Sequence, residues 1–352
     1  MFQILQGDWI EQLKTLPNES VQCVVTSPPY YGLRDYGVKD QLGLEKTPEE
    51  YVAKIVDGFR EVKRVLRNDG TLWLNLGDSY SSHKDCKSIG QTLAKGTSRE
   101  DAHVMPLGLS RVRDSRMLKK EGFKNKDLIG IPWMVAFALR ADGWYLRQDI
   151  IWAKPNPMPE SVTDRCTKSH EYIFLLTKAA RYYYNAKAIM EPLQTFENRP
   201  YGIVRDRDFN YASKQKILRS KVASNSKKAD AQYITNASQK KWAERVINGE
   251  IPESRNKRSV WFITTKPYKE AHFAAFPPEI PKICILAGSK KGDIILDPFA
   301  GSGTTGEVAL KLDRNFIGIE LNQRYVNDLI IPRLENINPL FRREDEHKTQ
   351  SH

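Results

Sequence analysis

Short apolar runs and amphipathic segments alternate in the first part of the chain. Residues 21–25 and 71–76 are apolar runs rich in β-branched, leucine and tryptophan side chains, which predicts two buried strands. Between them, apolar residues recur at helical spacing after Pro48, and the Asn-Asp-Gly sequence at 68–70 is expected to end that helix. Its apolar positions are Tyr51, Ile55, Val56, Phe59, Val62 and Leu66. A strand–helix–strand order with a helix-length connection predicts a parallel sheet.

The same alternation returns later in the chain. A helix is expected at 131–139, and strands are expected at 145–152 and 172–177. Three prolines at 155, 157 and 159 exclude regular structure in the connection between these strands. Further helices are predicted at 280–287 and 304–311, and further strands at 2–5, 293–296 and 316–319. The chain is therefore expected to fold as an α/β protein.

Two polar, basic segments interrupt this alternation and define the expected domain organisation. The α/β core is expected in three pieces, at 1–80, 128–180 and 259–335, with insertions at 81–127 and 181–258 and a polar tail at 336–352. The chain has 352 residues, of which 40% are hydrophobic. That is enough to bury a core, so a wholly disordered chain is excluded.

The positive charge is concentrated in the two insertions. The formal net charge is +12, and segments 81–127 (11 basic, 6 acidic) and 181–258 (17 basic, 8 acidic) carry +5 and +9, which leaves about −2 for the remainder. Segment 181–258 also interleaves cations with Tyr182, Tyr183, Tyr184, Tyr201, Phe209, Tyr211, Tyr233 and Trp242. This combination is typical of nucleic-acid surfaces, where rings stack on bases and cations meet phosphates. The alternative is a small separate fold whose aromatic residues form its own core.

Cysteine and histidine spacing gives no support to a disulfide framework or a metal site. The four cysteines (Cys23, Cys86, Cys166 and Cys284) form no CxxC pair, and the six histidines show no HExxH spacing.

No apolar run approaches the roughly 20 residues of a membrane span, and the N-terminal sequence lacks the features of a secretory signal. We expect a cytoplasmic protein with no metal cofactor.

A glycine-rich turn connects a predicted strand and helix near the C-terminus. Its sequence, DPFAGSGTTG (297–306), has GxGxxG spacing, which lets the backbone approach a ligand at a helix N-terminus. That spacing alone is a weak indication of a dinucleotide. Asp297 ends the strand before the turn, and Glu320 ends the next strand. An acid at each of two strand ends favours a nucleoside that also carries a cationic amino acid, such as S-adenosylmethionine; the alternatives are a helix cap for Asp297 and a surface charge for Glu320.

A second turn, Thr-Ser-Pro-Pro-Tyr at 26–30, directly follows the first buried strand. Two prolines make it rigid and leave carbonyl oxygens without local N–H partners. Ser27 adds a hydroxyl acceptor and Tyr30 adds a ring. Together these groups could hold a planar heterocycle by stacking and by hydrogen bonds to its exocyclic amine, and the alternative is an ordinary surface turn with a buried tyrosine.

Taken together, five motifs resemble those of the amino-methyltransferases of DNA. They are TSPPY (26–30), LGDSY (76–80), SHEYIFLLTK (169–178), KPYKEAHFAAFP (266–277) and DPFAGSGTT (297–305) with Glu320. The catalytic turn precedes the cofactor loop, which resembles the β group of these enzymes, and 181–258 occupies the place of their target-recognition region. The resemblance implies a class I, Rossmann-like fold with a mostly parallel seven-stranded sheet and helices on both faces.

The resemblance also implies roles for single residues. Ser27, the carbonyl of Pro28, Pro29 and Tyr30 would hold a target base flipped out of double-stranded DNA. Phe299, Gly301, Gly303, Thr304 and Asp297 would bind the methionine end of S-adenosyl-L-methionine, Glu320 its ribose, and Asp8 its adenine amine, although Asp8 is equally explained as a turn residue. Lys266, His272 and Phe273 belong to a motif that usually flanks the cofactor. No metal takes part.

The target base is expected to be cytosine, methylated at N4, because Ser-Pro-Pro-Tyr is commoner among cytosine-N4 enzymes, and adenine N6 is the alternative. Methylation at cytosine C5 is rejected, since none of the cysteines follows a proline as its thiolate usually does. Other readings are a nicotinamide dehydrogenase, an RNA or protein-amide methyltransferase, and a non-catalytic DNA-binding protein. Expected partners are double-stranded DNA and, functionally, a restriction endonuclease of a bacterial, archaeal or phage system; nucleoid association and a homodimer are further expectations.

Overall fold

The computed structural model describes residues 1–32, 41–81, 122–192, 254–265 and 276–337. The chain divides into two compact units, Met1–Ile189 with Arg258–His352, and Met190–Lys257. Within the described ranges, no helix has the length and apolar character that a membrane crossing requires.

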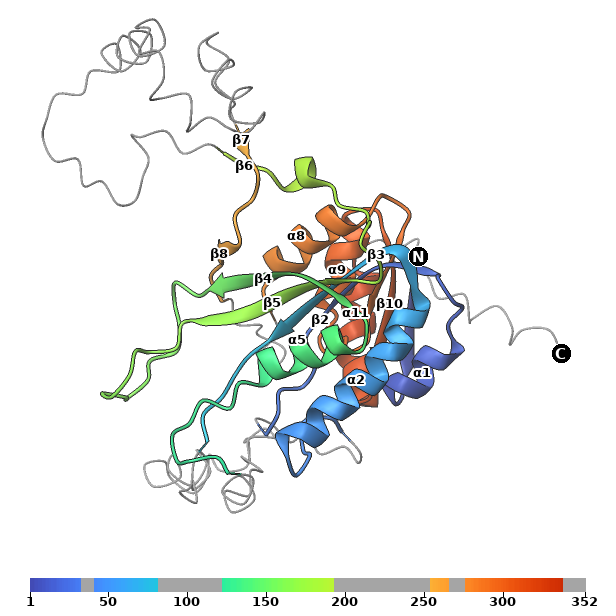
Figure 1. The fold of residues 1–352 in the computed structure, drawn as a ribbon. Coiled ribbons are helices and arrows are strands. Elements are labelled where there is room, and N and C mark those ends of the chain that lie inside the picture. Colours follow the sequence, from blue (N-terminus) through green and yellow to red (C-terminus); the bar gives the residue numbers. More distant parts are fainter. Residues whose placement is uncertain (33–40, 82–121, 193–253, 266–275, 338–352) are drawn as a thin grey trace, which may run out of the picture. The chain divides into compact units, whose positions relative to one another are not determined.

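An eight-stranded sheet forms the centre of the first unit (Figure 1). Its strands are β1 (Phe2–Gln6), β2 (Val21–Thr26), β3 (Leu66–Leu76), β4 (Tyr145–Ala153), β5 (His170–Thr177), β8 (Val260–Phe262), β9 (Ile294–Asp297) and β10 (Asn315–Glu320). The spatial order is β1-β10-β9-β2-β3-β5-β4-β8. Strand β5 runs antiparallel to β3 and β4, and the other pairs are parallel. The mostly parallel α/β fold is as predicted.

The described sheet has one strand more than the seven expected. The additional strand is β8, which pairs with β4 at the edge of the sheet and places Trp261 opposite Trp152. Trp261 is buried, whereas its neighbours Val260 and Phe262 are exposed. A strand of three residues is too short for the periodicity to reveal.

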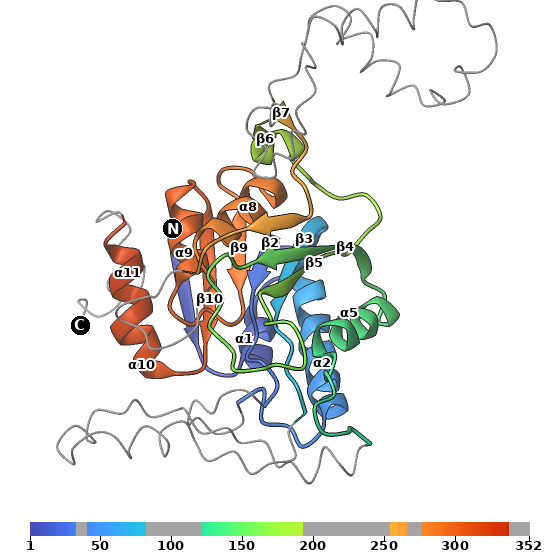
Figure 2. The same ribbon diagram turned by 90° about the vertical axis from the view of Figure 1, so that its left-hand side faces the viewer.

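Helices cover both faces of this sheet (Figure 2). One face packs against α1 (Trp9–Thr15), α2 (Pro48–Val65) and α5 (Ile131–Ala141), and the other packs against α8 (Glu279–Gly288), α9 (Thr304–Lys311) and α11 (Ile331–Glu335). Successive residues of β2 point to opposite faces, so Val24 joins the first core and Val25 the second. The remaining short elements of this unit are η2 (Ala186–Ile189), α10 (Gln323–Tyr325) and η4 (Val326–Ile330).

The junction of α2 and β3 differs from the prediction. The helix ends at Val65 and the strand begins at Leu66, so the Asn-Asp-Gly sequence lies inside β3 and does not end the helix. Leu66 is completely buried and pairs with Val21, and the pairing of β2 with β3 then shifts register. Burial of Leu66 therefore overrides the local turn signal, and the irregular pairing accommodates the polar residues.

Both basic segments are attached to the described structure by paired backbone. Ser81 accepts a hydrogen bond from Lys126 and donates one to Asp127, at 2.9 and 2.7 Å, next to a bridge between Tyr80 and Leu128. In the second unit, β6 (Glu191–Pro192) pairs antiparallel with β7 (Ser254–Arg255). Most of both insertions, and therefore most of their predicted DNA contacts, lies outside the described residues.

The predicted boundary at 181 is shifted, because residues up to Ile189 belong to the first unit. Tyr184 stacks on the buried Trp73 with ring centroids 6.4 Å apart, and Tyr182 packs against the same core. The backbone N–H of Tyr183 donates to Asp69. These three tyrosines thus belong to the body that holds the sheet, and their part in a recognition surface stays a prediction.

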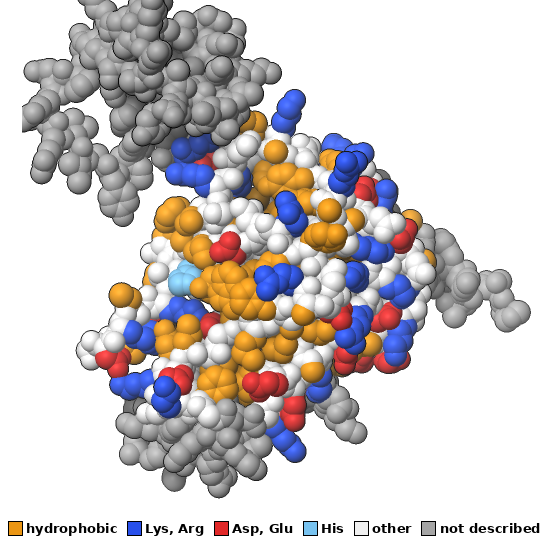
Figure 3. Space-filling model, in the orientation of Figure 1, with side chains coloured by type: hydrophobic (Ala, Val, Ile, Leu, Met, Phe, Trp, Pro, Cys, Tyr) orange, Lys and Arg blue, Asp and Glu red, His pale blue; other side chains and the backbone are white. Residues whose placement is uncertain are grey.

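One face of the described surface carries side chains of both charges (Figure 3). Figure 3 shows one face, on which hydrophobic side chains gather in the middle and side chains of both charges surround them. The described residues on this face form no continuous positive patch. This agrees with a nearly neutral chain outside the two basic segments.

Candidate active site

The carboxyl ends of β1, β2, β9 and β10 open onto one cavity of about 440 Å³. Parallel strands end at the same edge of a sheet, which is where α/β folds bind ligands, and the volume is typical of small-molecule sites. Ten of the predicted residues line the cavity: Asp8, Ser27, Pro28, Pro29, Tyr30, Asp297, Phe299, Gly301, Thr304 and Glu320. The two turns singled out in the sequence, about 270 residues apart, therefore share one site.

Gly303 is a predicted residue that does not line the cavity. It precedes α9 as its N-cap with a φ of 77°, and a Cβ there would lie 3.3 Å from Cγ2 of Ile330. Gly301 also has a positive φ, of 56°, and its N–H faces Glu320. Gly303 thus shapes the loop, whereas Gly301 borders the cavity.

Asp297 is a buried carboxylate held entirely by the fold around it. Its Oδ1 accepts from the hydroxyl of Thr26 at 2.7 Å and from the N–H of Phe299 at 3.1 Å, and its Oδ2 accepts from the hydroxyl of Thr305 at 2.7 Å. Burial raises the pKa of Asp297 to about 6, against the lowering effect of these hydrogen bonds. Asp297 therefore joins β9 to β2 and α9 and adds a negative charge to the floor of the cavity.

Glu320 ties the glycine loop to the end of β10. Its Oε2 accepts from the N–H of Gly301 and its Oε1 from the N–H of Asn322, each at 2.9 Å. Burial, assisted by the nearby Asp297, raises the pKa of Glu320 to about 7. At neutral pH both protonation states of this carboxyl are populated, so a ligand that hydrogen-bonds the ionised form can shift the balance.

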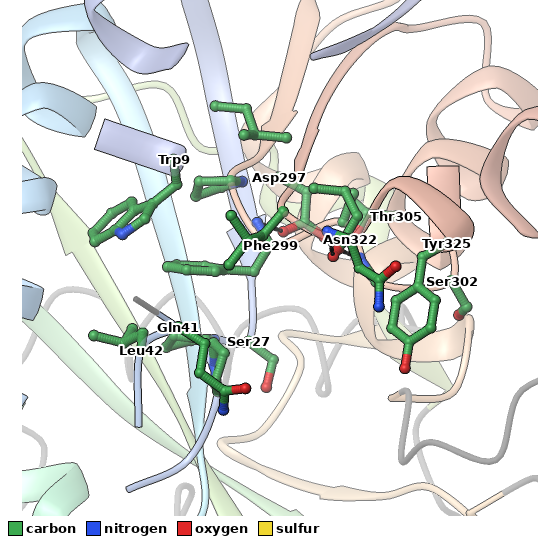
Figure 4. A pocket seen from close by; sticks show the side chains of 18 of the residues that line it. Trp9, Ser27, Gln41, Leu42, Asp297, Phe299, Ser302, Thr305, Asn322 and Tyr325 are labelled. Atoms are coloured by element: carbon green, nitrogen blue, oxygen red, sulfur yellow. Dashed lines mark hydrogen bonds between the residues drawn. The ribbon is translucent and has the colours of Figure 1, made fainter. Parts of the chain in front are cut away.

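Asp8 has a structural task as well as a place in the cavity wall. Its Oδ1 accepts from the backbone N–H of Ile10 and Glu11, at 2.9 and 3.1 Å, and so caps α1. Neither this helix nor the role of the neighbouring Trp9 was predicted from the sequence. The rings of Trp9 and Phe299 lie side by side, 4.7 Å between centroids, at one end of the cavity, and Tyr325 lies at the other (Figure 4).

The Ser-Pro-Pro-Tyr turn is fixed from behind by side chains of other elements. The hydroxyl of Tyr51 on α2 donates to the carbonyl of Pro29 at 2.9 Å. The hydroxyl of Tyr30 donates to Oε2 of Glu171 on β5 at 2.7 Å, and a Cβ at Gly77 would lie 2.6 Å from the Tyr30 ring. The carbonyl oxygen of Pro29 thus already accepts a hydrogen bond within the protein, and the carbonyl oxygen of Pro28 remains the predicted acceptor for a ligand.

The described cysteines and acids offer neither a thiolate nor a metal site at the cavity. Burial raises the pKa of the Cys23 thiol to about 12 and that of Cys284 well above its usual range. No group of three potential metal ligands occurs among the described residues. Lys266, His272 and Phe273 lie outside the described residues, so their expected roles stay predictions.

Comparison with known protein families settles the identity. A family model described as "DNA methylase" matches residues 21–331, which is most of the chain. The chain belongs to this DNA methylase family. The predicted membership among the amino-methyltransferases of DNA is thereby confirmed, and the dehydrogenase alternative loses its basis.

Individual relatives of this DNA methylase resemble it along most of their length. It is 41% identical to the Type II methyltransferase M.Cfr9I of Citrobacter freundii, over 94% of this chain and 87% of that protein. It is 42% identical to the Type II methyltransferase M.SmaI of Serratia marcescens, over 92% of this chain and 88% of that protein.

Two solved structures share the fold of the methylase. TTHA0409 of Thermus thermophilus, solved with S-adenosyl-L-methionine, has a TM-score of 0.54 and 21% identity, over 97% of this chain and 96% of that one. The PvuII DNA methyltransferase (cytosine-N4-specific) has a TM-score of 0.55 and 17% identity, over 96% and 90%. These likenesses confirm the class I methyltransferase fold.

Proposed function

We propose that this DNA methylase transfers a methyl group from S-adenosyl-L-methionine to N4 of a cytosine flipped out of double-stranded DNA. The observation that carries the proposal is the single cavity that runs from the glycine loop to the Ser-Pro-Pro-Tyr turn. A methyl donor and an acceptor amine must meet within bonding distance, and a shared cavity permits that. Adenine N6 is the alternative target.

The described residues fit the cofactor. The cavity is large enough for a nucleoside with an amino acid, the rings of Trp9 and Phe299 form an apolar wall, and Asp8, Asp297 and Glu320 add acceptors and negative charge. When bound, S-adenosyl-L-methionine supplies an electrophilic methyl group on a positively charged sulfur. Glu320 would accept hydrogen bonds from ribose hydroxyls, and Asp297, whose oxygens are already hydrogen-bonded, would act through its charge.

The target amine would be held by the other turn. The Ser27 hydroxyl and the Pro28 carbonyl would accept its two N–H groups, and the Tyr30 ring would stack on the base. These acceptors would localise the lone pair of the nitrogen that receives the methyl group. The sulfur of the donor would leave as a neutral thioether, and the proton that the amine loses would pass to solvent. Positioning and charge placement supply the catalysis.

The choice of cytosine rests on Ser27. The resembling enzymes with Asp at this position mostly modify adenine, whereas Ser-Pro-Pro-Tyr is commoner among the cytosine-N4 enzymes. None of the described cysteines lines the cavity, which also supports amine chemistry over attack by a thiolate at C5.

Nucleoside mass spectrometry tests the proposal directly. Unmethylated bacterial DNA is incubated with the purified protein and S-adenosyl-L-methionine and then digested to nucleosides. We expect N4-methylcytosine. N6-methyladenine would overturn the choice of base while leaving the site chemistry, and no methylated base on varied DNA would overturn the activity.

The relatives point to a Type II restriction-modification setting with DNA as substrate. Within that setting we propose functional pairing with a restriction endonuclease of the same recognition sequence, with the methylase working in the cytoplasm at the nucleoid. Segment 181–258, with its net charge of +9, is proposed to read the target sequence. We also propose that the methylase forms a homodimer.

A further inference from the structure

A polar network lies directly behind the Ser-Pro-Pro-Tyr turn, and the proposed chemistry does not yet use it. The Tyr30 hydroxyl lies 2.7 Å from Oε2 of Glu171 and 2.9 Å from Nδ2 of Asn75, and Asn75 Nδ2 lies 3.0 Å from the same Glu171 oxygen. Lys154 pairs with the other oxygen, Oε1. The members come from the ends of β3, β4 and β5, all next to the turn that follows β2.

The chemistry of the groups in this network decides which of them donate and which accept. A carboxylate only accepts, so the O–H of Tyr30 and an N–H of Asn75 both donate to Glu171. The amide of Asn75 cannot be reversed, because its oxygen would then face the carboxylate oxygen at 3.0 Å. Burial and the charge of Glu171 raise the pKa of Tyr30 well above its usual value, so the phenol keeps its proton.

This assignment fixes the direction of the Ser27 hydroxyl. Ser27 Oγ lies 3.4 Å from the Tyr30 oxygen and 3.4 Å from Asn75 Nδ2. The proton of Tyr30 is already given to Glu171, so the Tyr30 oxygen can only accept from Ser27. The two N–H groups of Asn75 have three acceptors, Glu171, Tyr30 and the more distant Ser27, so a hydrogen bond to Ser27 is a shared one and uses at most one lone pair of the serine. The second lone pair is left for the cavity.

We propose that Glu171 is a positioning residue, which orients the Tyr30 and Ser27 hydroxyls so that Ser27 offers a lone pair, and not a proton, to the target amine. The inference rests on the proposed function, since it requires an amine as the ligand of Ser27. Glu171 does not line the cavity, and it acts through its hydrogen bond with the Tyr30 hydroxyl.

Lys154 determines which end of the residue 171 side chain must be an acceptor. Its ammonium group lies over the Trp152 ring, 4.5 Å from the centroid, and it and Glu171 are 20% and 15% exposed. An ammonium group can only donate, so it requires an acceptor at Oε1. In Glu171→Gln the amide oxygen would therefore face Lys154, and the amide nitrogen would face Tyr30 and Asn75. The nitrogen would donate to the Tyr30 oxygen, so the Tyr30 proton would be released toward Ser27.

The test compares Glu171→Gln with the parent in single-turnover methylation, with enzyme in excess over DNA and with saturating cofactor. We expect the rate of transfer to fall about 10- to 100-fold, as for the loss of one oriented polar contact in an active site, with the Kd values for cofactor and DNA within about twofold of the parent. Glu160→Gln is the matched control. Glu160 pairs with Arg165 in the same β4–β5 connection and does not line the cavity, so its rate should stay at the parental value.

A double-mutant cycle with Tyr30→Phe separates positioning from a general structural effect. Without the Tyr30 hydroxyl, Glu171 can no longer direct a hydroxyl proton next to Ser27, so Glu171→Gln should slow Tyr30→Phe by less than about twofold. Equal losses in both backgrounds, or a parental rate in Glu171→Gln, would overturn the positioning role. A parent enzyme that forms no methylated base would instead overturn the proposed function, so the two failures are distinguishable.

Discussion

The backbone N–H of Gly301 donates to the Glu320 carboxylate at 2.9 Å, across the gap between the loop after β9 and the end of β10. This hydrogen bond holds the Glu320 carboxylate, the proposed acceptor for the ribose hydroxyls, in a fixed position before the cofactor binds. Burial raises the pKa of this carboxyl to about 7 and outweighs the hydrogen bonds, which favour its charged form.

Cofactor binding should therefore strengthen as pH rises from about 6 to about 8, across the folded-state pKa of Glu320. Glu320 is partly protonated at neutral pH, and only its ionised form accepts from both ribose hydroxyls. Isothermal titration calorimetry of the parent and Glu320→Gln at several pH values measures this, and binding to the parent should release protons. The ligand 5′-methylthioadenosine keeps the ribose and lacks the amino group that also titrates here. If the affinity of the parent and the variant for it changed equally with pH, the assignment would be wrong.

Asp297→Asn should separate folding from cofactor binding. The folded-state pKa of Asp297, about 6, lies above its ordinary value of 3.8, so its contribution to stability is present below about pH 4 and is lost as pH rises through 6, a cost of about 3 kcal/mol. Asn avoids this cost and can still accept from Thr26 and Phe299. We expect a melting temperature at about pH 8 no lower than that of the parent, with cofactor affinity reduced at least about 10-fold. A melting temperature that drops at that pH would contradict this account.

Tyr30→Ala should slow methyl transfer about 100-fold or more while leaving cofactor binding near the parental value. The ring is proposed to stack on the base, whereas the predicted cofactor residues lie on the glycine loop and at Glu320. Single-turnover rates and cofactor titrations measure the two effects separately. Equal losses in both would contradict the division of the cavity into a base half and a cofactor half.

DNA affinity should fall steeply with salt. Segments 81–127 and 181–258 together carry +14, and each phosphate contact that they make releases bound counterions. Fluorescence anisotropy between about 50 and 200 mM salt should give a log–log slope of several units, corresponding to a loss of about 10³-fold or more for six contacts. A flat response would show that these cations do not contact phosphates.

Most helices and strands of the core, though not α1, α11 or β8, could be predicted because their signals are local. Helix α2 begins where Pro48 follows Thr47, whose side chain accepts from the N–H of Glu50, and its apolar face is buried as the spacing indicates. The α2–β3 junction could not be predicted in this way. There, burial of Leu66 against the sheet decides the structure, and this is a tertiary effect without a local signal.

In the site, too, only the residues with a local signal could be predicted from the sequence. Ser27, Tyr30, Asp297 and Glu320 stood out in the sequence because each follows or ends a strand, and strand ends meet at one edge of a parallel sheet. The sequence indicates Glu171 only as a member of the motif at 169–178. Its contact with Tyr30, 141 residues away, depends on β5 running antiparallel beside β3, and no local pattern in the chain indicates that direction.

Each insertion leaves and re-enters the described structure at nearly the same point. The backbone at its two ends is paired, Ser81 with Asp127 in the first insertion and Glu191 with Arg255 in the second. Such attachment makes the insertions exchangeable cassettes, since their length or sequence can change without moving the strand ends that carry the chemistry. Evolution could thus give an unaltered catalytic frame a new DNA target, and chimeras joined at these four residues offer the same route to the protein engineer.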